Sequence, residues 1–598
     1  MKHFTTLALL LATTSLASAA SNESFIGQIG DRNTALVGQT SGNNKQGTMQ
    51  VGRRNAAVTT QDTAGNKTNE SGVLQIGNRN GALVGQTGGN NRQGTIQGGY
   101  RNNAITSQQG SQTDGKLNTS TTGQFGAFNN SLVSQKDGNN AQTTLQIGTG
   151  NSAVTSQDKA GVKTNTSTTT QIGAFNGALV TQTGGNNVQN TLSVGAGNTA
   201  VTSQSGVQTN GRVNSSDIVQ FGVGNTALAT QDGGSNDQGT LQLGYRNAAV
   251  TGQVSNPYGG TNTATTAQIG VGNKALTVQN SHGDKSYAAT NGTLTGSVTT
   301  TAKYWNLSGL QNPGSFSLGP VPFGYTAPAV AGGVNLASTV QIGKDNSAVT
   351  LQDSNGIRTG ASLPVGPVPW LVGVTNKETS IKLFPWSTPT IVNTPTATPA
   401  FGTATGTIAA PDAIALNGVG NNATTLQVGV KNTALTAQDG ANLLPVSNDS
   451  LVAQLGVQNA AVVGQSNGLN AQATVQAGYK NEAVTSQKNP TVGLSQNAAA
   501  TLQAGARNKA LTGQVANPLN VGLNGSLIAQ VGVGNTAVAS QTQQTGLQPM
   551  IGALNTQATV QVGYNNYAVT AQASSASVAN TSVTAQFGSH NAAITVQK

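Results

Sequence analysis

Polar and small residues occupy alternate positions in two short stretches of each unit of this chain, and a Gly-x-x-Asn segment lies between the stretches. In the first unit, Gln28 and Gly30 have even sequence numbers and so lie two residues apart. Asn33, Ala35 and Gln39 all have odd sequence numbers, so they too are separated by even numbers of residues. Successive side chains of a strand point to opposite faces, so each set lies on one face of its strand. Because Gly and Asn are usual in tight turns, each unit is predicted to form strand, turn and strand.

The pattern Gln-x-Gly-x-x-Asn-x-Ala-x-x-x-Gln recurs nineteen times, from 28–39 to 586–597. Recurrence at a nearly fixed period is typical of solenoids, in which each repeat packs on its neighbours. Equivalent residues of stacked strands lie about 4.8 Å apart. We therefore predict an all-β fold, a β-solenoid of stacked strand-turn-strand (cross-β) rungs with about nineteen repeats and two irregular insertions.

The side-chain amides of Asn and Gln carry both a donor and an acceptor, so equivalent amides can hydrogen-bond along such a stack. We predict that the amide face, with Ala for close approach of the two sheets, forms the dry interior. Aliphatic residues beside the turn then point outward. The inverse arrangement, with the aliphatic residues inside, is the alternative. The structural ladder residues predicted in the first three repeats and the last one are Gln28, Gly30, Asn33, Ala35, Gln39, Gln50, Gly52, Asn55, Ala57, Gln61, Gln75, Gly77, Asn80, Ala82, Gln86, Gln586, Gly588, Asn591, Ala593 and Gln597.

The repeats come as doublets. The position four residues before the first Gln of the pattern alternates between a small and a large residue, as in Ser24, Gln46, Ser71 and Gln93. A small residue would then stack beside a large one, and we expect the Gln of one rung to fill the space that the Ser of the next rung leaves.

The twelve-residue core resembles the curlin repeat of curli-type amyloid fibre subunits, which bacteria secrete. The family usually has Ser six residues upstream of the first Gln, where this chain has Asn, as at Asn22 and Asn44. The resemblance covers most of 22–279 and 421–598 and an isolated copy at 341–352. It implies export through an outer-membrane secretion pore, a nucleator subunit as a partner, and fibres at the bacterial cell surface that serve adhesion and the biofilm matrix.

Six segments follow from the pattern: a signal peptide at 1–19, repeats at 20–279, 341–353 and 421–598, and insertions at 280–340 and 354–420. The first segment has a basic start, an apolar run and an Ala-x-Ala site, which are typical of secretory signals. The insertions are rich in Pro and hold all three Trp. Because Pro cannot donate to a ladder, we expect them outside the stack, either as decorated loops or as a binding surface that uses Tyr304-Trp305, Pro369-Trp370 and Phe384-Pro385-Trp386.

The formal net charge is +10, and many basic residues lie between the Gly and the Asn of the repeat. Stacked turns would line them up as a stripe. Such a stripe is either solvated charge or an attraction to acidic polysaccharide, DNA or cell surfaces. No interleaved aromatic residues indicate specific nucleic-acid recognition. The turn cations in question are Arg53, Arg54, Arg79, Arg101, Arg246, Lys431, Lys480 and Arg507.

Catalytic chemistry has little support. The chain has no Cys and three His, charged residues make up 8% of it, and aromatic residues 4%. These fractions are low for a globular enzyme. His282 and Asp284 form a pair that is more typical of a polar loop than of a metal site. We expect no enzyme activity, no cofactor and no metal.

Two functions therefore remain open. The first is a secreted structural subunit that assembles with itself into amyloid-like extracellular fibres, because only Lys598 follows the last repeat and an uncapped strand edge favours further pairing. The alternative is a monomeric β-solenoid surface adhesin whose 280–420 insertions bind a target. A surface-binding or ice-binding Thr array is disfavoured, since the Thr positions share the face assigned to the interior.

Overall fold

The computed structural model describes residues 22–598 except 64–66, 111–115, 159–162, 207–211, 301–303, 307–308, 312–313, 382–389, 492–494, 518–519, 544–549 and 575–578. The predicted signal peptide at 1–19 and the Phe384-Pro385-Trp386 segment lie outside the described residues. In the described part of the chain every helix or strand element is a β-strand. The prediction of an all-β solenoid is thus confirmed. In those same ranges, no helix has the length and apolar character needed to cross a membrane.

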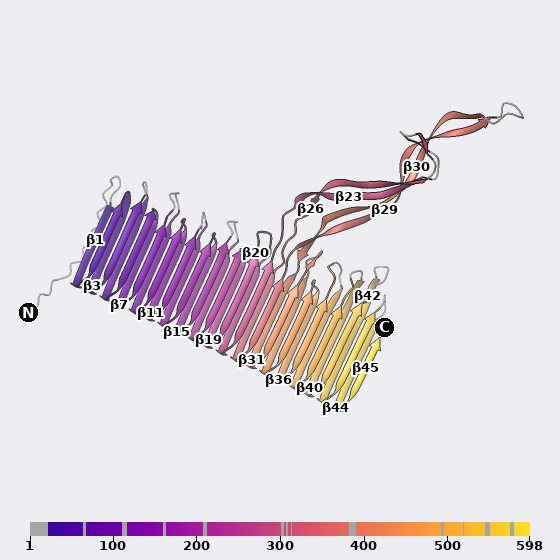
Figure 1. The fold of residues 1–598 in the computed structure, drawn as a ribbon. Helices are drawn as coiled ribbons and strands as arrows, with labels where there is room; N and C mark the ends of the chain where they lie inside the picture. Colours follow the sequence, from indigo (N-terminus) through magenta and orange to yellow (C-terminus); the bar gives the residue numbers. More distant parts are fainter. Residues whose placement is uncertain are drawn as a thin grey trace, which may run out of the picture.

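Two long parallel sheets make up the stack (Figure 1). Each repeat contributes one strand to each sheet, and we call this pair of strands a rung. The first sheet contains β1 (Asn22–Asp31), β3 (Asn43–Arg53), β5 (Thr68–Asn78), β7 (Asn91–Tyr100), β9 (Asn118–Ala127), β11 (Asn140–Thr149), β13 (Asn165–Ala174), β15 (Asn187–Ala196), β17 (Asn214–Val223), β19 (Asn236–Tyr245), β21 (Asn262–Val271), β27 (Asn335–Lys344), β31 (Gly420–Val430), β34 (Ser447–Val457), β36 (Asn470–Tyr479), β38 (Gln496–Ala506), β40 (Asn520–Val533), β42 (Met550–Tyr564) and β44 (Ala579–Ser589).

The second sheet faces the first across the interior. It contains β2 (Thr34–Thr40), β4 (Ala56–Thr63), β6 (Gly81–Gly88), β8 (Asn103–Gln109), β10 (Asn130–Lys136), β12 (Ser152–Asp158), β14 (Gly177–Thr183), β16 (Thr199–Gly206), β18 (Thr226–Gly233), β20 (Ala248–Ser255), β22 (Lys274–Ser281), β28 (Ser347–Asp353), β32 (Thr433–Asp439), β35 (Ala460–Ser466), β37 (Glu482–Lys488), β39 (Lys509–Val515), β41 (Thr536–Gln543), β43 (Tyr567–Ser574) and β45 (Ala592–Gln597).

Neighbouring rungs pair in the register that the sequence pattern dictates. Gln28 lies opposite Gln50 in the first sheet, and Ala35 lies opposite Ala57 in the second. The two insertions do not interrupt the stack, because β21 pairs with β27 and β27 pairs with β31. The isolated repeat therefore forms an ordinary rung between the two arrays.

The interior is polar. Gln50, Gln75 and Asn55 are fully buried, together with the Ala and Thr of their faces, whereas Ile76 and Leu83 beside the turn are 50% and 45% exposed. The structure thus has the amide face inside, and the inverse arrangement is wrong. Among the described residues, the buried apolar clusters are small, and each of them combines Ala with Val or Ile.

The turn of each rung depends on two positive φ angles. The repeat Gly has φ near 120°, as at Gly52 (123°), and the residue before the Asn has φ between 53° and 68° in almost every rung, as at Arg54 (57°). A Cβ on Gly52 would lie 2.0 Å from the carbonyl oxygen of Gly77 in the next rung. Glycine is therefore required both by its φ and by the close approach of the stacked backbones. The second positive φ belongs to the residue before the Asn and not to the Asn itself.

The described residues of the two insertions fold together as one arm, which we define as residues 285–329 and 357–417 without the gaps given above. Figure 1 shows it leaving the stack at the edge that carries the linkers between rungs. Its long strands β23, β26, β29 and β30 form an antiparallel sheet, in which β23 of the first insertion pairs with β30 of the second. The strands of this sheet are β23 (Tyr287–Thr300), β24 (Tyr304–Asn306), β25 (Gly309–Gln311), β26 (Gly314–Ala327), β29 (Ile357–Ile381) and β30 (Thr390–Gly418), to which β33 (Ala441–Asn442) is joined at the base.

The arm consists of paired strands, whereas decorated loops were one of the two expectations from the sequence. Proline residues lie within its strands, such as Pro322 in the edge strand β26 and Pro367 where the β29–β30 register shifts between Val365 and Val368. Edges and bulges tolerate a missing N–H. The Pro content therefore excludes these segments from the stack without excluding strands.

Candidate functional site: the ladders, the ends and the turn edge

Two glutamine ladders run along the interior. In the first sheet, Gln50 Nε2 donates to Gln75 Oε1 at 2.7 Å and to the carbonyl oxygen of Thr34 in the opposite sheet at 3.0 Å. In the second sheet, Gln61 Nε2 donates to Gln86 Oε1 at 2.7 Å and to the carbonyl oxygen of Lys45 at 3.1 Å. Each glutamine thus connects its rung to the next and ties the two sheets together.

Two asparagine ladders have the opposite sense. Asn44 Nδ2 donates back to Asn22 Oδ1 of the previous rung at 2.8 Å. At the turn, the backbone N–H of Asn55 donates to Asn33 Oδ1 at 3.0 Å, and Asn55 Nδ2 donates forward to the carbonyl oxygen of Gly77 at 3.1 Å. The Asn of the repeat is therefore needed for its side chain, which holds successive turns in register.

The doublets have a hydrogen-bonded basis. Ser71 Oγ donates to Gln93 Oε1 at 2.9 Å, and Gln93 Nε2 donates to Thr95 Oγ1 in its own strand. The small residue does lie beside the large one, as the alternation predicts. Ser120 and Gln142 repeat the arrangement at 2.8 Å.

The predicted ladder residues differ in exposure according to rung. Those of the second and third repeats are buried apart from the turn glycines, whereas those of the first repeat are exposed or half-buried. In the last repeat, Gln586 is buried, and Asn591, Ala593 and Gln597 are half-buried. The end rungs thus carry the same groups as the interior rungs, but with one side uncovered.

The two ends of the stack carry complementary unused groups. At the C-terminal end, Gln586 Nε2 and Gln597 Nε2 each donate only to a carbonyl oxygen, at 3.0 and 2.8 Å, and lack the second acceptor that equivalent amides have. At the N-terminal end, no donor among the described residues reaches the amide oxygens of Gln28 and Gln39. The asparagine ladders end in the opposite way. At the C-terminal end, no donor in the described ranges reaches Asn580 Oδ1 or Asn591 Oδ1. At the N-terminal end, Asn22 Nδ2 and the backbone N–H of Asn33 are the matching donors.

We call the two residues between the Gly and the Asn of each rung the turn edge. It holds ten basic residues and two carboxylates, whereas the rest of the chain has eighteen basic and sixteen acidic residues. Nearly all of the net charge is therefore on this edge. The ten basic residues are Arg32, Arg53, Arg54, Arg79, Arg101, Arg246, Lys344, Lys431, Lys480 and Arg507.

Sequence reasoning missed the aromatic residues of the turn edge. The guanidinium of Arg101 lies 4.9 Å from the ring centroid of Tyr100, and that of Arg246 lies 4.6 Å from the Tyr245 ring. The ammonium of Lys480 lies 5.0 Å from the Tyr479 ring. The recurring Gly-Tyr-Arg/Lys-Asn segment is the signal that could have revealed these cation–π pairs.

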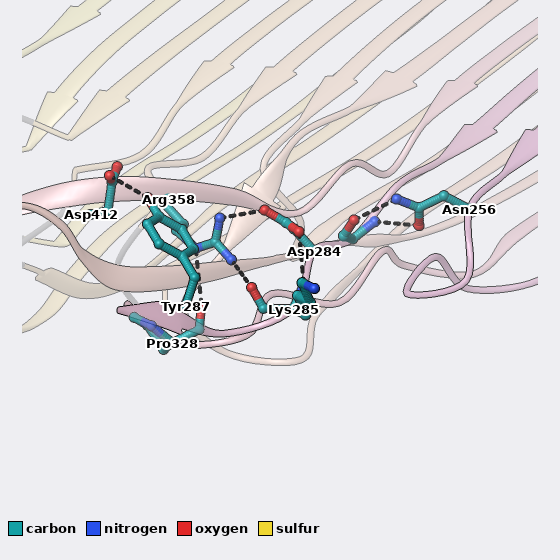
Figure 2. A network of polar contacts seen from close by, with 8 residues as sticks. Asn256, Asp284, Lys285, Tyr287, Pro328, Arg358 and Asp412 are labelled. Carbon is teal, nitrogen blue, oxygen red and sulfur yellow. Dashed lines mark hydrogen bonds and ion pairs between the residues drawn. The ribbon is translucent and has the colours of Figure 1, made fainter. Parts of the chain in front are cut away.

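A polar network fixes the base of the arm (Figure 2). Arg358, whose side chain is 11% exposed, forms an ion pair with Asp284 at 2.6 Å and donates to the carbonyl oxygens of Pro328, at 3.0 Å, and Lys285. The hydrogen bond from Arg358 lowers the pKa of Asp284 below its ordinary value of 3.8. His282 contacts Asn355, whose Oδ1 accepts from the His282 backbone N–H at 2.8 Å and lies 3.2 Å from His282 Nδ1. Within the described ranges there is no group of three or more His, Asp or Glu side chains that could hold a metal ion.

Tyr287 extends this network. Its ring lies 4.6 Å from the Arg358 guanidinium, and its hydroxyl donates to Asp412 Oδ2 at 2.6 Å. That hydrogen bond raises the pKa of Tyr287. The network joins the starts of β23 and β29 to the last part of β30, so the arm is attached by several strands at once.

No known family model matches the chain, and no characterised protein resembles it closely enough to count as a relative.

Proposed function

We propose that the protein is a secreted structural subunit that assembles with itself into amyloid-like, curli-type fibres at the bacterial cell surface, for adhesion and the biofilm matrix. The observation that carries this proposal is the complementarity of the two ends of the stack. The secretion pore and the nucleator subunit are partners that the curlin resemblance implies.

Head-to-tail contact satisfies the unused groups. When β44 and β45 of one copy lie on β1 and β2 of the next, Gln586 Nε2 meets Gln28 Oε1 and Gln597 Nε2 meets Gln39 Oε1. The asparagine groups pair in the opposite sense. The joint then repeats the register inside the stack, at about 4.8 Å. Because the two surfaces are different and the step is a translation along the axis, the contact is heterologous and does not close, which produces a filament.

The test replaces the unused hydrogen-bond donors at the C-terminal end of the stack by acceptors. Gln586→Glu and Gln597→Glu together replace two donors by carboxylates, which face the Gln28 and Gln39 oxygens of the next copy. Gln561 Nε2 and Gln572 Nε2 can still donate to the new carboxylates. Inside the copy, the change therefore removes only the bonds from positions 586 and 597 to the carbonyl oxygens of Tyr567 and Thr581. We expect the parent mature chain to form fibres with a 4.7–4.8 Å meridional reflection and the double variant to remain as rods about 90 Å long.

A matched variant makes the result specific. Gln28→Lys with Gln39→Lys should also block growth on its own, and mixing the two variants should restore joints between them, because each carboxylate then meets an ammonium. Electron microscopy of the separate and mixed variants distinguishes the outcomes. Fibres from the Glu variant alone, or a parent that never forms fibres, would contradict the proposal.

The arm favours a second candidate, a monomeric surface adhesin whose 280–420 region binds a target. Asp284 and Val330 exchange two backbone hydrogen bonds, of 2.8 and 2.9 Å, so 285–329 can be replaced by a short turn. Gly356 and Gly418 both lie against Ala331, so 357–417 can be replaced in the same way. The rung of β27 and β28 is kept.

A fibre subunit without the arm should still assemble. An adhesin should stay soluble with or without the arm, and should lose its attachment to surfaces when the arm is removed. Electron microscopy and a cell-surface attachment assay on the same two proteins separate these functions.

A further inference from the structure

The turn edge has features that the formation of a stack does not require. The residue before the Asn has a left-handed conformation in the rungs, and Gly occupies this place at Gly150, Gly197, Gly224, Gly272 and Gly534. Gly adopts that conformation at no steric cost, whereas other residues do so uncommonly. Eight rungs nevertheless have Arg or Lys there. The cations are therefore not explained by the geometry of the turn.

The basic side chains of the turn edge are exposed and lie in one row along the stack. All ten basic residues of the turn edge are exposed except the half-buried Arg54. Five of them belong to the first four rungs, and the other five lie in the second half of the stack. Asp31 partly neutralises the first group, because it lies 3.2 Å from Arg53 and 3.9 Å from Arg32. Adjacent rungs are about 4.8 Å apart, a step comparable to one sugar unit of an extended polysaccharide.

The aromatic residues indicate which polyanion fits. Tyr245 and Tyr479 are 39% and 38% exposed beside their cations. A tyrosine next to a cation offers an apolar surface for the C–H groups of a sugar ring and a charge for its carboxylate. Tyr100 and Tyr245 are six rungs apart, or about 30 Å, so successive bases of single-stranded DNA could not stack on them. Duplex DNA winds its phosphates away from a straight row.

We propose that the turn edge binds a linear acidic polysaccharide that carries carboxylates, with the turn cations pairing with the carboxylates and the tyrosines contacting sugar rings. The surface runs along the side of the stack and does not include the amide groups that end-to-end contact uses. Polysaccharide binding therefore goes beyond fibre assembly and does not depend on it.

The experiment compares variants that lack equal numbers of charges. The edge variant carries Arg79→Gly, Arg101→Gly, Arg246→Gly, Lys480→Gly and Arg507→Gly, all at left-handed positions where Gly is native in other rungs. The control variant carries five changes away from the turn edge, which are Lys45→Gln, Lys116→Gln, Lys136→Gln, Lys285→Gln and Lys488→Gln. A third variant carries Tyr100→Ala, Tyr245→Ala and Tyr479→Ala, since Ala occupies this place at Ala127 and Ala506.

Binding of alginate, polyphosphate and duplex DNA is measured by biolayer interferometry on the mature full-length chain at low and physiological salt. We expect the parent to bind alginate, the edge variant to bind it roughly tenfold or more weakly, and the control variant to keep nearly all of its affinity. The tyrosine variant should lose affinity for alginate and keep its affinity for polyphosphate.

Three results would overturn the proposal: a parent that does not bind alginate, equal losses in the edge and control variants, or a tyrosine variant with unchanged affinity for alginate. A parent that binds DNA or polyphosphate but not alginate would assign the edge to another polyanion and would equally refute it. Electron microscopy of the same samples records fibre formation separately, so failure of one proposal is distinguishable from failure of the other.

Discussion

The first glutamine ladder has one natural defect, and repairing it should stabilise the stack. Ser193 stands where the pattern has Gln, is fully buried, and donates to Gln220 Oε1 at 3.1 Å. Gln171 Nε2 of the previous rung consequently donates only to the carbonyl oxygen of Ser152, at 3.0 Å. The substitution Ser193→Gln should restore a continuous ladder from Gln171 through position 193 to Gln220.

The magnitude follows from an intact rung. Gln146 accepts from Gln124 at 2.8 Å, donates to Gln171 at 2.8 Å and donates to the carbonyl oxygen of Asn130 at 2.9 Å. Ser193 makes one of the three equivalent bonds, so the repair adds two. At about 0.5–1.5 kcal/mol for each buried hydrogen bond, we expect a gain of about 1–3 kcal/mol. The converse change, Gln146→Ser, creates the same defect in another rung of the same doublet type and should cost a similar amount.

The assay must keep assembly out of the stability measurement. We therefore place both changes in the Gln586→Glu, Gln597→Glu background and measure guanidinium unfolding by circular dichroism. Because stability in a solenoid is largely local, hydrogen exchange of the amides of β13, β15 and β17 should show the increased protection directly. If Ser193→Gln destabilises the chain while Gln146→Ser has no effect, the amide ladder is not what stabilises adjacent rungs.

Two further predictions test the turn and the arm. Gly173 has φ 119°, and a Cβ there would lie 2.0 Å from the carbonyl oxygen of Gly195, so Gly173→Ala should cost roughly 2–3 kcal/mol or more. Gly94 has open space around a Cβ, and Gly94→Ala in the same unfolding assay should change stability by less than about 1 kcal/mol; equal effects at the two sites would disprove the close-approach argument. Arg358→Gln should increase hydrogen exchange at the starts of β23 and β29 and leave the rungs protected, and unchanged exchange there would show that Arg358 does not fix the arm. Arg358 lowers the pKa of Asp284, so the stabilisation of the arm by the Arg358–Asp284 ion pair is fully present above the ordinary pKa of that carboxyl. In the parent it should be lost as the pH falls through the lowered pKa, whereas the hydrogen exchange of the Arg358→Gln variant should show no such transition.

The repeat determined most of what could be predicted from the sequence. Alternation around Gln28 and Asn33 identified the faces of both strands, and recurrence fixed the register, because a shift of even one residue would expose every amide of the rung. The doublet of Ser71 and Gln93 was visible as an alternation in side-chain size. These features depend only on local pattern and on stacking of like residues.

The features that could not be predicted depend on contacts between segments that the repeat pattern does not connect. The pairing of β23 with β30 joins two insertions separated by a rung, and no periodicity in the sequence of either insertion predicts it. The sequence shows that Gly and Asn suit a tight turn, but not which residue adopts the left-handed conformation. The ladder uses the Asn side chain, and the residue before the Asn, such as Arg54 or Phe175, adopts the positive φ. The Gly-Tyr-Arg/Lys-Asn segments are present in the sequence, but only the structure shows that the stacked turns form one surface on which each tyrosine lies beside its cation.

The positions of the arm and the turn edge are consistent with growth at the ends. The arm leaves the stack at the linker edge, after β22 and β28, and Figure 1 shows it rising away from the stack on the side of the C-terminal array, with β1 and β45 left uncovered. The cations lie on the opposite edge, where successive copies would extend the same row. Each added copy would therefore lengthen the interior ladders, repeat the arm at intervals of about 90 Å and extend the charged edge. A polysaccharide that bridges two copies along that edge would then gain effective concentration from every neighbour, so polymerisation itself should strengthen its binding.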